Sequence, residues 1–179
     1  EIEGVKFEGH SFNSLSIIGK HNYSEAQLHR FTLQPIQVWN TTRIDEELTN
    51  FTLDFVIPQL ITDVASGYVS NIDLLLNYSL TATNERFVIS LTLDGVIYTG
   101  SSDFIEIAFD QIRNLFEDKY RFKNCYGCMY GDYSVYGSNS FGTMLCFANQ
   151  KQEYQATNSK DAYMELAPPR DQVQEIYCC

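Results

Sequence analysis

Alternating apolar and polar positions dominate the middle of the chain. Every second residue from Ile72 to Ala82 is apolar, Thr83-Asn84-Glu85 can turn, and the alternation resumes from Phe87 to Leu93. A period of two residues is typical of strands with one buried face. Asp94-Gly95 then fits a two-residue turn with positive φ at both positions, which Val96–Thr99 would follow as a third strand. The pattern predicts an antiparallel meander.

The period changes directly after the meander. From Phe104 to Tyr120, apolar residues recur every three to four positions, with acidic and polar residues between them. This spacing predicts an amphipathic helix of about four turns. Ser102 or Asp103 marks its start, and Glu106 would complete an acidic form of the capping box with Asp103. We expect the apolar stripe to cover the hydrophobic face of the sheet.

Four segments before residue 60 are rich in β-branched and aromatic residues and predict further strands. They are Val5–Phe7, Leu15–Ile18, Phe31–Trp39 and Phe51–Ile57. Pro35 and Pro58 would each remove a ladder donor, so the strands around them are expected at a sheet edge or to end there. Residues 1–120 are therefore predicted to form an α+β body, mainly an antiparallel sheet covered by one amphipathic helix.

The amino-acid composition changes from residue 121, where glycine and tyrosine are interleaved with all five cysteines. Such a segment is not expected to form a long regular element. We expect residues 121–179 to be an irregular Cys/Gly/Tyr-rich subregion that packs on the body as part of one compact unit. Short helical turns are predicted at Lys151–Gln155 and Lys160–Leu166, and a strand at Val173–Cys178.

Four cysteines are candidate metal ligands. Cys125 and Cys128 form a C-x-x-C pair, and Cys146 and Cys178 follow at looser separations. A two-residue spacing lets one turn aim both sulfur atoms at a cation, and four thiolates suit tetrahedral zinc, with iron as the alternative. Because a closed shell leaves no position for substrate, the zinc is expected to be structural. Cys179 is a second candidate for the fourth ligand.

Other interpretations of the cysteines stay open. An odd number confined to one end fits a secreted disulfide framework poorly and favours a reducing, cytoplasmic compartment. The thiols could also be free, with Cys146 a small buried apolar residue. A thioredoxin-like redox site is disfavoured, because its C-x-x-C begins a helix, whereas this pair follows one.

Charge narrows the choice of partner. The chain has 179 residues, 44% of them hydrophobic, which suffices for one core, and its net charge is -11. That charge repels phosphate backbones and anionic headgroups, so nucleic acid and membranes are not expected as partners, whereas a basic protein is. No stretch approaches the roughly 20 apolar residues of a membrane-spanning helix, and the first residues lack the pattern of a secretory signal.

A polar aromatic cluster after the C-x-x-C pair is the candidate partner-binding surface. Its members are Tyr130, Asp132, Tyr133 and Tyr136. Tyrosine offers rigid amphipathic contact area at low entropic cost, although these side chains could instead pack around the metal loop. No catalytic residue is predicted, because the sequence contains no glycine-rich phosphate loop and no G-x-S-x-G motif.

The C-terminal sequence also resembles a group of uncharacterised bacterial proteins that share a domain of unknown function. The residues that carry the resemblance are Cys125–Gly137, Phe141–Phe147, Lys151–Tyr154 and Val173–Cys178. Their signature has the form CxxC, DYSxYG, FGxMxC and VQExYxC. The resemblance implies that Cys125, Cys128, Cys146 and Cys178 recur and implies no activity. Residues 1–120 contribute little to it, and Cys179 is extra.

Three functions follow from these observations. The first is a non-enzymatic bacterial protein-binding module with a structural zinc site formed by four cysteines, of which an immunity-type protein is one form. The second is a metalloenzyme with an open zinc site, in which Asp132 or Glu175 would be the base. The third is a small-ligand-binding domain with a pocket between the meander and the N-terminal strands.

Overall fold

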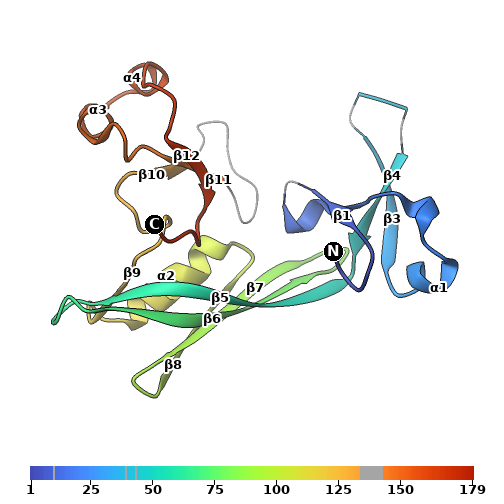
Figure 1. The fold of residues 1–179 in the computed structure, drawn as a ribbon, viewed down its shortest axis with the longest axis horizontal. Coiled ribbons are helices and arrows are strands. Elements are labelled where there is room, and N and C mark those ends of the chain that lie inside the picture. Colours follow the sequence, from blue (N-terminus) through green and yellow to red (C-terminus); the bar gives the residue numbers. More distant parts are fainter. Residues whose placement is uncertain (10, 39, 43, 134–142) are drawn as a thin grey trace.

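The computed structural model describes residues 1–9, 11–38, 40–42, 44–133 and 143–179 (Figure 1). In these ranges the chain is an α+β protein built mainly from antiparallel sheets, as predicted. A central sheet carries the main helix, the N-terminal strands form a second sheet at one end, and the C-terminal residues form a third. No helix in the described part of the chain is long and apolar enough to span a membrane.

The central sheet contains the predicted meander. Its strands in spatial order are β8 (Val96–Ser102), β7 (Glu85–Leu93), β6 (Val69–Leu80), β5 (Phe51–Asp63) and β9 (Tyr120–Phe122). Strands β6, β7 and β8 pair consecutively, with Ile89 between Leu76 and Gly100. Asp94 and Gly95 have φ values of 50° and 77°, which confirms the predicted turn.

The N-terminal strands form a four-stranded sheet. Its order is β1 (Phe7–Glu8), β2 (Ser16–Ile17), β4 (Ile44–Thr49) and β3 (Thr32–Gln37). The sequence pattern missed β4, because its acidic residues interrupt the apolar alternation. It also missed three short helices, η1 (Phe12–Ser14), η2 (Lys20–Asn22) and α1 (Glu25–Leu28). Trp39, placed in a strand by the pattern, lies outside the described residues.

Both prolines lie at open sheet edges, as predicted. Pro35 is in β3, the last strand of its sheet. Pro58 is opposite Asp73 of β6, whereas β9 pairs with β5 only at Ile61–Asp63. No described strand therefore pairs with the other side of β5 at Pro58, which is where a proline is tolerated. Because that edge is open, β5 continues beyond Pro58.

The main helix, α2 (Ile105–Leu115), is shorter than predicted and has a different N-cap. Phe104 occupies the N-cap without a side-chain hydrogen bond, so the predicted Asp103 capping box is wrong. The hydroxyl of Ser102 instead accepts from the backbone N–H of Phe104, 3.3 Å away. After the helix, Glu117 and Asp118 have φ values of 48° and 63°, and this left-handed turn directs the chain into β9.

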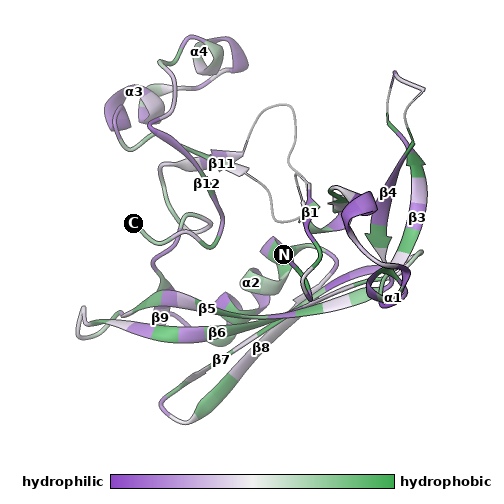
Figure 2. Cartoon of the chain, turned by 45° about the vertical axis from the view of Figure 1, so that its right-hand side comes forward, coloured by the Kyte–Doolittle hydropathy of each residue, from purple (hydrophilic) through white to green (hydrophobic). Residues whose placement is uncertain are grey.

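Helix α2 and one face of the central sheet enclose the core. Each fully buried aliphatic or aromatic side chain there contributes roughly 1.5–3 kcal/mol of hydrophobic stabilisation. The buried residues are Ile61, Leu74, Leu76, Tyr78, Phe87, Ile89, Leu91, Leu93, Ile105, Ala108, Phe109, Ile112, Phe116 and Tyr120. Figure 2 shows apolar and polar residues alternating along the strands, which is the pattern expected of one buried face.

The C-terminal residues form more regular structure than predicted. Strands β10 (Gly131–Tyr133), β11 (Thr143–Cys146) and β12 (Asp171–Gln174) make a small antiparallel sheet. The two predicted helical turns are present as α3 (Lys151–Ala156) and α4 (Lys160–Met164). The strand predicted to reach Cys178 ends at Gln174, because Glu175 and Ile176 form a turn.

Helix α2 approaches β8 closely at Gly100. An ideal Cβ at Gly100 would lie 2.0 Å from the backbone oxygen of Ala108, far inside van der Waals contact. Only a residue without a side chain therefore allows this helix-to-sheet distance.

Gly100→Ala should lower the free energy of unfolding by about 1–3 kcal/mol, because the new methyl group would force α2 away from the sheet. Urea unfolding followed by circular dichroism measures the change. Thr99→Ala, on the exposed side of the same strand, is the control and should leave the midpoint nearly unchanged. Equal midpoints for Gly100→Ala and the unmodified protein would contradict the close packing.

Candidate functional site

A buried amide joins the C-terminal residues to the central sheet. Gln59 of β5 is fully buried, and its side chain donates to the carbonyl of Ile176 at 2.8 Å and to that of Pro58 at 3.0 Å. Its carbonyl accepts from the side chain of Asn124, 3.0 Å away. One side chain of the sheet thus fixes both the segment before the C-x-x-C pair and the segment before Cys178.

The C-x-x-C loop is positioned by backbone and ring contacts. The N–H groups of Cys125 and Tyr126 donate to the carbonyls of Tyr177 and Glu175, at 2.9 and 3.0 Å. The Tyr126 ring stacks on Phe109 of α2, with 5.6 Å between ring centroids. Cys128 N–H donates to the Cys125 carbonyl at 3.1 Å, which closes the tight turn expected between paired cysteines.

Strand pairing brings Cys146 close to the C-x-x-C loop. Gly131 of β10 is directly opposite Cys146 of β11, and side chains of opposed residues share one face of a sheet. An ideal Cβ on Gly131 would lie 3.6 Å from the Cβ of Cys128. Cys128 therefore lies over the face of the sheet from which Cys146 projects. Tyr130 N–H also donates to the Cys128 sulfur at 3.4 Å.

The ionisation of Cys125 is influenced by burial and by all four other thiols. Burial raises the pKa of the Cys125 thiol to about 11, and the nearby thiols of Cys128, Cys179, Cys146 and Cys178 add to the effect. Cys125 and Cys146 are buried, Cys128 and Cys178 half-buried, and Cys179 exposed, and all are free thiols. The structure thus gathers cysteines that lie as far as 54 positions apart in sequence.

The gathered thiols are not arranged as a finished coordination shell. Across the described ranges, no three Cys, His, Asp or Glu side chains are close enough together to hold a metal ion. A thiophilic cation would have to draw the sulfur atoms inward and displace their protons, which couples binding to local folding. The donor set is otherwise suited to zinc, because it is all sulfur and largely buried.

The structure describes three members of the predicted polar aromatic cluster, Tyr130, Asp132 and Tyr133, and all three are half-buried. Tyr133 is directed inward, where its hydroxyl donates to Glu175 at 3.2 Å and lies beside Glu106. Burial, reinforced by these two carboxylates, raises the pKa of Tyr133. Glu175 is fully buried at this contact, which is a poor position for the base of an open metal site. Tyr136 lies outside the described residues.

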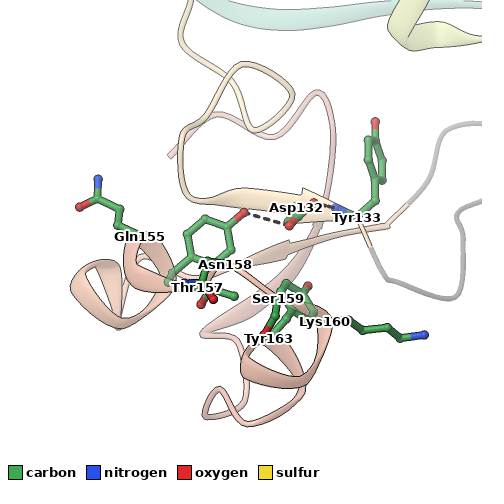
Figure 3. A pocket seen from close by; sticks show the side chains of 9 residues that line it. Asp132, Tyr133, Gln155, Thr157, Asn158, Ser159, Lys160 and Tyr163 are labelled. Atoms are coloured by element: carbon green, nitrogen blue, oxygen red, sulfur yellow. Dashed lines mark hydrogen bonds between the residues drawn. The ribbon is translucent and has the colours of Figure 1, made fainter.

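Asp132 lines a pocket between β10 and the two C-terminal helices (Figure 3). The pocket has a volume of about 820 Å³. Its lining residues are Asp132, Tyr133, Tyr154, Gln155, Thr157, Asn158, Ser159, Lys160 and Tyr163. Asp132 accepts from the Tyr154 hydroxyl and from the Tyr133 N–H, both at 2.9 Å. In Figure 3 the Tyr133 ring and the Lys160 side chain both extend away from the Asp132 carboxylate.

Aromatic packing fixes two walls of this pocket. The Tyr154 ring stacks on Phe147 at 4.8 Å, and Tyr163 meets the same ring edge-on at 5.6 Å. Burial and the nearby Asp132 carboxylate raise the pKa of both tyrosines, so their hydroxyls stay neutral. The Tyr163 hydroxyl is buried without a hydrogen-bond partner among the described residues. The sequence gives no signal that Tyr154 and Tyr163 belong to one site, because their shared contact is Phe147, directly after β11, and no periodic pattern links the three.

Comparison with known proteins identifies one family. Its sequence pattern matches residues 1–131, and it is described as a family of unknown function (DUF6304). The match covers the body and the C-x-x-C pair, whereas the C-terminal resemblance rests mainly on later residues. No curated protein and no solved structure matches the chain.

Gln59→Leu should loosen the C-terminal segment, because it leaves the Asn124 amide and the Ile176 carbonyl buried without their hydrogen-bond partner. Each unpaired group should lower the free energy of unfolding by about 1–3 kcal/mol. Amide hydrogen exchange measures this at Cys125 and Tyr126, whose N–H groups bond to that segment. Both should exchange faster, while Leu76 in the central sheet should change little. Gln172→Leu, at an exposed position of β12, is the control, and equal exchange in the two variants would contradict the anchoring role.

Proposed function

The chain belongs to this family of unknown function, and from its own geometry we propose that it is a non-enzymatic protein-binding module that receives a basic side chain of its partner beside Asp132. One observation carries the proposal. The carboxylate of Asp132 lies on the wall of a pocket of about 820 Å³ whose other walls include two tyrosine rings. A negative charge flanked by aromatic faces is suited to a lysine or arginine side chain.

The chemistry of this pocket favours a cation. Aromatic rings attract an ammonium or guanidinium group by about 0.5–2 kcal/mol, and a carboxylate adds a charge-assisted hydrogen bond. The chain uses a related contact nearby, where the Lys151 ammonium lies 4.8 Å from the centroid of the Tyr130 ring. The net charge of -11 would also steer a basic partner toward the protein.

Asp132→Asn should weaken binding of a lysine- and arginine-rich peptide by about tenfold, the factor that corresponds to about 1.4 kcal/mol. Fluorescence anisotropy at fixed ionic strength measures the affinity, and an acidic peptide of equal length should not bind. Asp161→Asn removes the same charge from an exposed position on α4 and serves as the control. If the two variants weaken binding equally, the attraction is non-specific and the pocket is not the binding site.

We further propose that Cys125, Cys128, Cys146 and one of the two terminal cysteines hold a structural zinc ion. Cys128 and Cys146 lie over the same face of the sheet formed by β10 and β11, beside the C-x-x-C turn that carries Cys125, and this arrangement supports the proposal. The role of the ion would be to fix the small C-terminal sheet against the body, because three short strands bury little apolar surface. A site of this kind contributes its binding free energy to folding.

Cys128→Ser and Cys146→Ser should each abolish stoichiometric zinc and lower the melting temperature of the C-terminal subregion, with a loss of several kcal/mol. Elemental analysis of the purified protein and hydrogen exchange of residues 143–179 measure the two effects. Asp132→Asn should keep its zinc and is the control. Protein prepared with added zinc that contains none, or serine variants with unchanged melting, would contradict the site.

An immunity-type role in a bacterium extends the binding proposal. Acidic charge, a small size and a cation-binding pocket would suit a protein that neutralises a basic toxin. Capture of a basic protein from the native host by the unmodified chain, and not by Asp132→Asn, would support that role.

A further inference from the structure

We infer that the open edge of β8 is a docking site for an extended segment of a partner protein. The segment would have apolar residues at alternate positions and lysine or arginine at the end that lies beside the β7–β8 turn. It would add to the central sheet as a further strand, antiparallel to β8. The edge shares no residue with the lining of the Asp132 pocket, and the inference does not depend on the zinc site.

Strand β8 is an edge strand without the usual protection. It is the outermost strand of the central sheet, and no described strand pairs with its outer side (Figure 1). Edge strands of natural proteins are commonly interrupted by proline or carry charged residues that discourage pairing. Pro35 and Pro58 interrupt the edges at β3 and β5, whereas Val96–Ser102 contains neither proline nor a charged residue. The sequence of β8 therefore permits a further strand to pair.

The backbone groups of β8 point outward at every second residue. The side-chain amide of Gln111 accepts from the Ser101 N–H at 2.8 Å and donates to the Ser101 carbonyl at 3.1 Å, so both groups of Ser101 point away from β7. Because this direction alternates along an antiparallel strand, the N–H and carbonyl groups of Ile97 and Thr99 also point to the open edge. These two positions can receive a partner strand, whereas Gln111 already occupies the third.

An apolar stripe of α2 borders the same edge. Ile107 and Leu115 lie four residues before and after Gln111 and therefore share its side of the helix. Because the Gln111 side chain bonds to Ser101, this side of α2 faces the edge of β8. Ile107 is 46% exposed, Leu115 54%, and Ile97 on the strand itself 71%. The apolar side chains of an added strand would cover the helical stripe, and main-chain bonds combined with such side-chain contacts are the usual basis of strand addition.

Acidic residues gather at one end of this edge. Asp94 lies in the β7–β8 turn, and Glu117 and Asp118 follow α2. The Lys119 ammonium bonds to the Asp94 carboxylate at 3.1 Å, which brings the end of α2 to this turn. Three carboxylates thus meet one ammonium, and a basic residue of the partner would complement the excess negative charge.

The same charges disfavour a second copy of the chain as the occupant. Antiparallel pairing of two β8 strands would place the Asp103 of the second copy, which directly follows β8, beside the acidic residues at the turn. Each chain also carries a net charge of -11. Because like charges oppose association, a partner with a basic end fits this edge better.

Hydrogen exchange at single residues tests the docking site. The probe is an N-acetylated peptide of three threonine–valine repeats followed by two lysines. At a peptide concentration that occupies about nine-tenths of the protein, exchange of the Ile97 and Thr99 N–H groups should slow about tenfold, because only the free fraction exchanges. The same peptide N-methylated at every amide should give no slowing, because it cannot pair as a strand.

Paired variants separate this edge from the rest of the surface. Ile97→Lys should weaken peptide binding at least about tenfold, because it removes an apolar contact and repels the lysines of the peptide. Val56→Lys introduces the same charge at an exposed apolar position of β5 and should keep the affinity within about twofold, because salt screens distant charges. Asp132→Asn should keep the slowed exchange of Ile97 and Thr99. Fluorescence anisotropy measures the affinities.

Several outcomes would overturn the inference. A peptide that leaves the exchange of Ile97 and Thr99 unchanged, or an N-methylated peptide that slows it equally, would show that no strand adds to β8. Equal binding of the peptide with glutamate in place of both lysines would overturn the basic end of the partner. A dimer of the unmodified protein, detected by light scattering and abolished by Ile97→Lys, would assign the edge to a second copy instead.

Discussion

The buried amide of Gln59 is the contact on which the candidate site depends. It bonds at once to the segment before the C-x-x-C pair and to the segment before the terminal cysteines. A buried polar side chain is costly unless its hydrogen bonds are satisfied, and here one of the satisfying groups lies 117 residues further along the chain. A shifted C-terminal segment would leave the Gln59 amide buried without its hydrogen-bond partners. The free-energy cost of those unpaired groups makes the docking of the segment specific.

Most of the central fold could be predicted from local sequence. The meander follows from strict alternation and from Asp94-Gly95, whose positive φ values only a few residue types adopt readily. The end of α2 could not be predicted in this way, because the apolar period runs on through Tyr120 while Glu117 and Asp118 adopt a left-handed turn. Tertiary pairing of β9 with β5 decides that boundary, and pairing leaves no periodic signal.

The candidate site was partly visible in the sequence. The C-x-x-C pair draws attention to the thiols, but their convergence depends on the register of β10 with β11 and on the Gln59 anchor, which no spacing rule contains. Asp132 was singled out for its aromatic neighbours, although the rings that flank it in the pocket are Tyr154 and Tyr163. Tyr133, chosen as a surface residue, is half-buried, and its hydroxyl is hydrogen-bonded to the buried Glu175.

The prolines on the open edges of two sheets have a consequence for the protein's behaviour at high concentration. An exposed edge strand presents unpaired backbone groups on which a second chain can add, and this is a common route to aggregation and amyloid. Pro35 on β3 and Pro58 on β5 each interrupt such a row. A second chain that approaches either edge therefore lacks one backbone N–H donor to pair with. The missing donor disfavours edge-to-edge association, while each sheet stays intact.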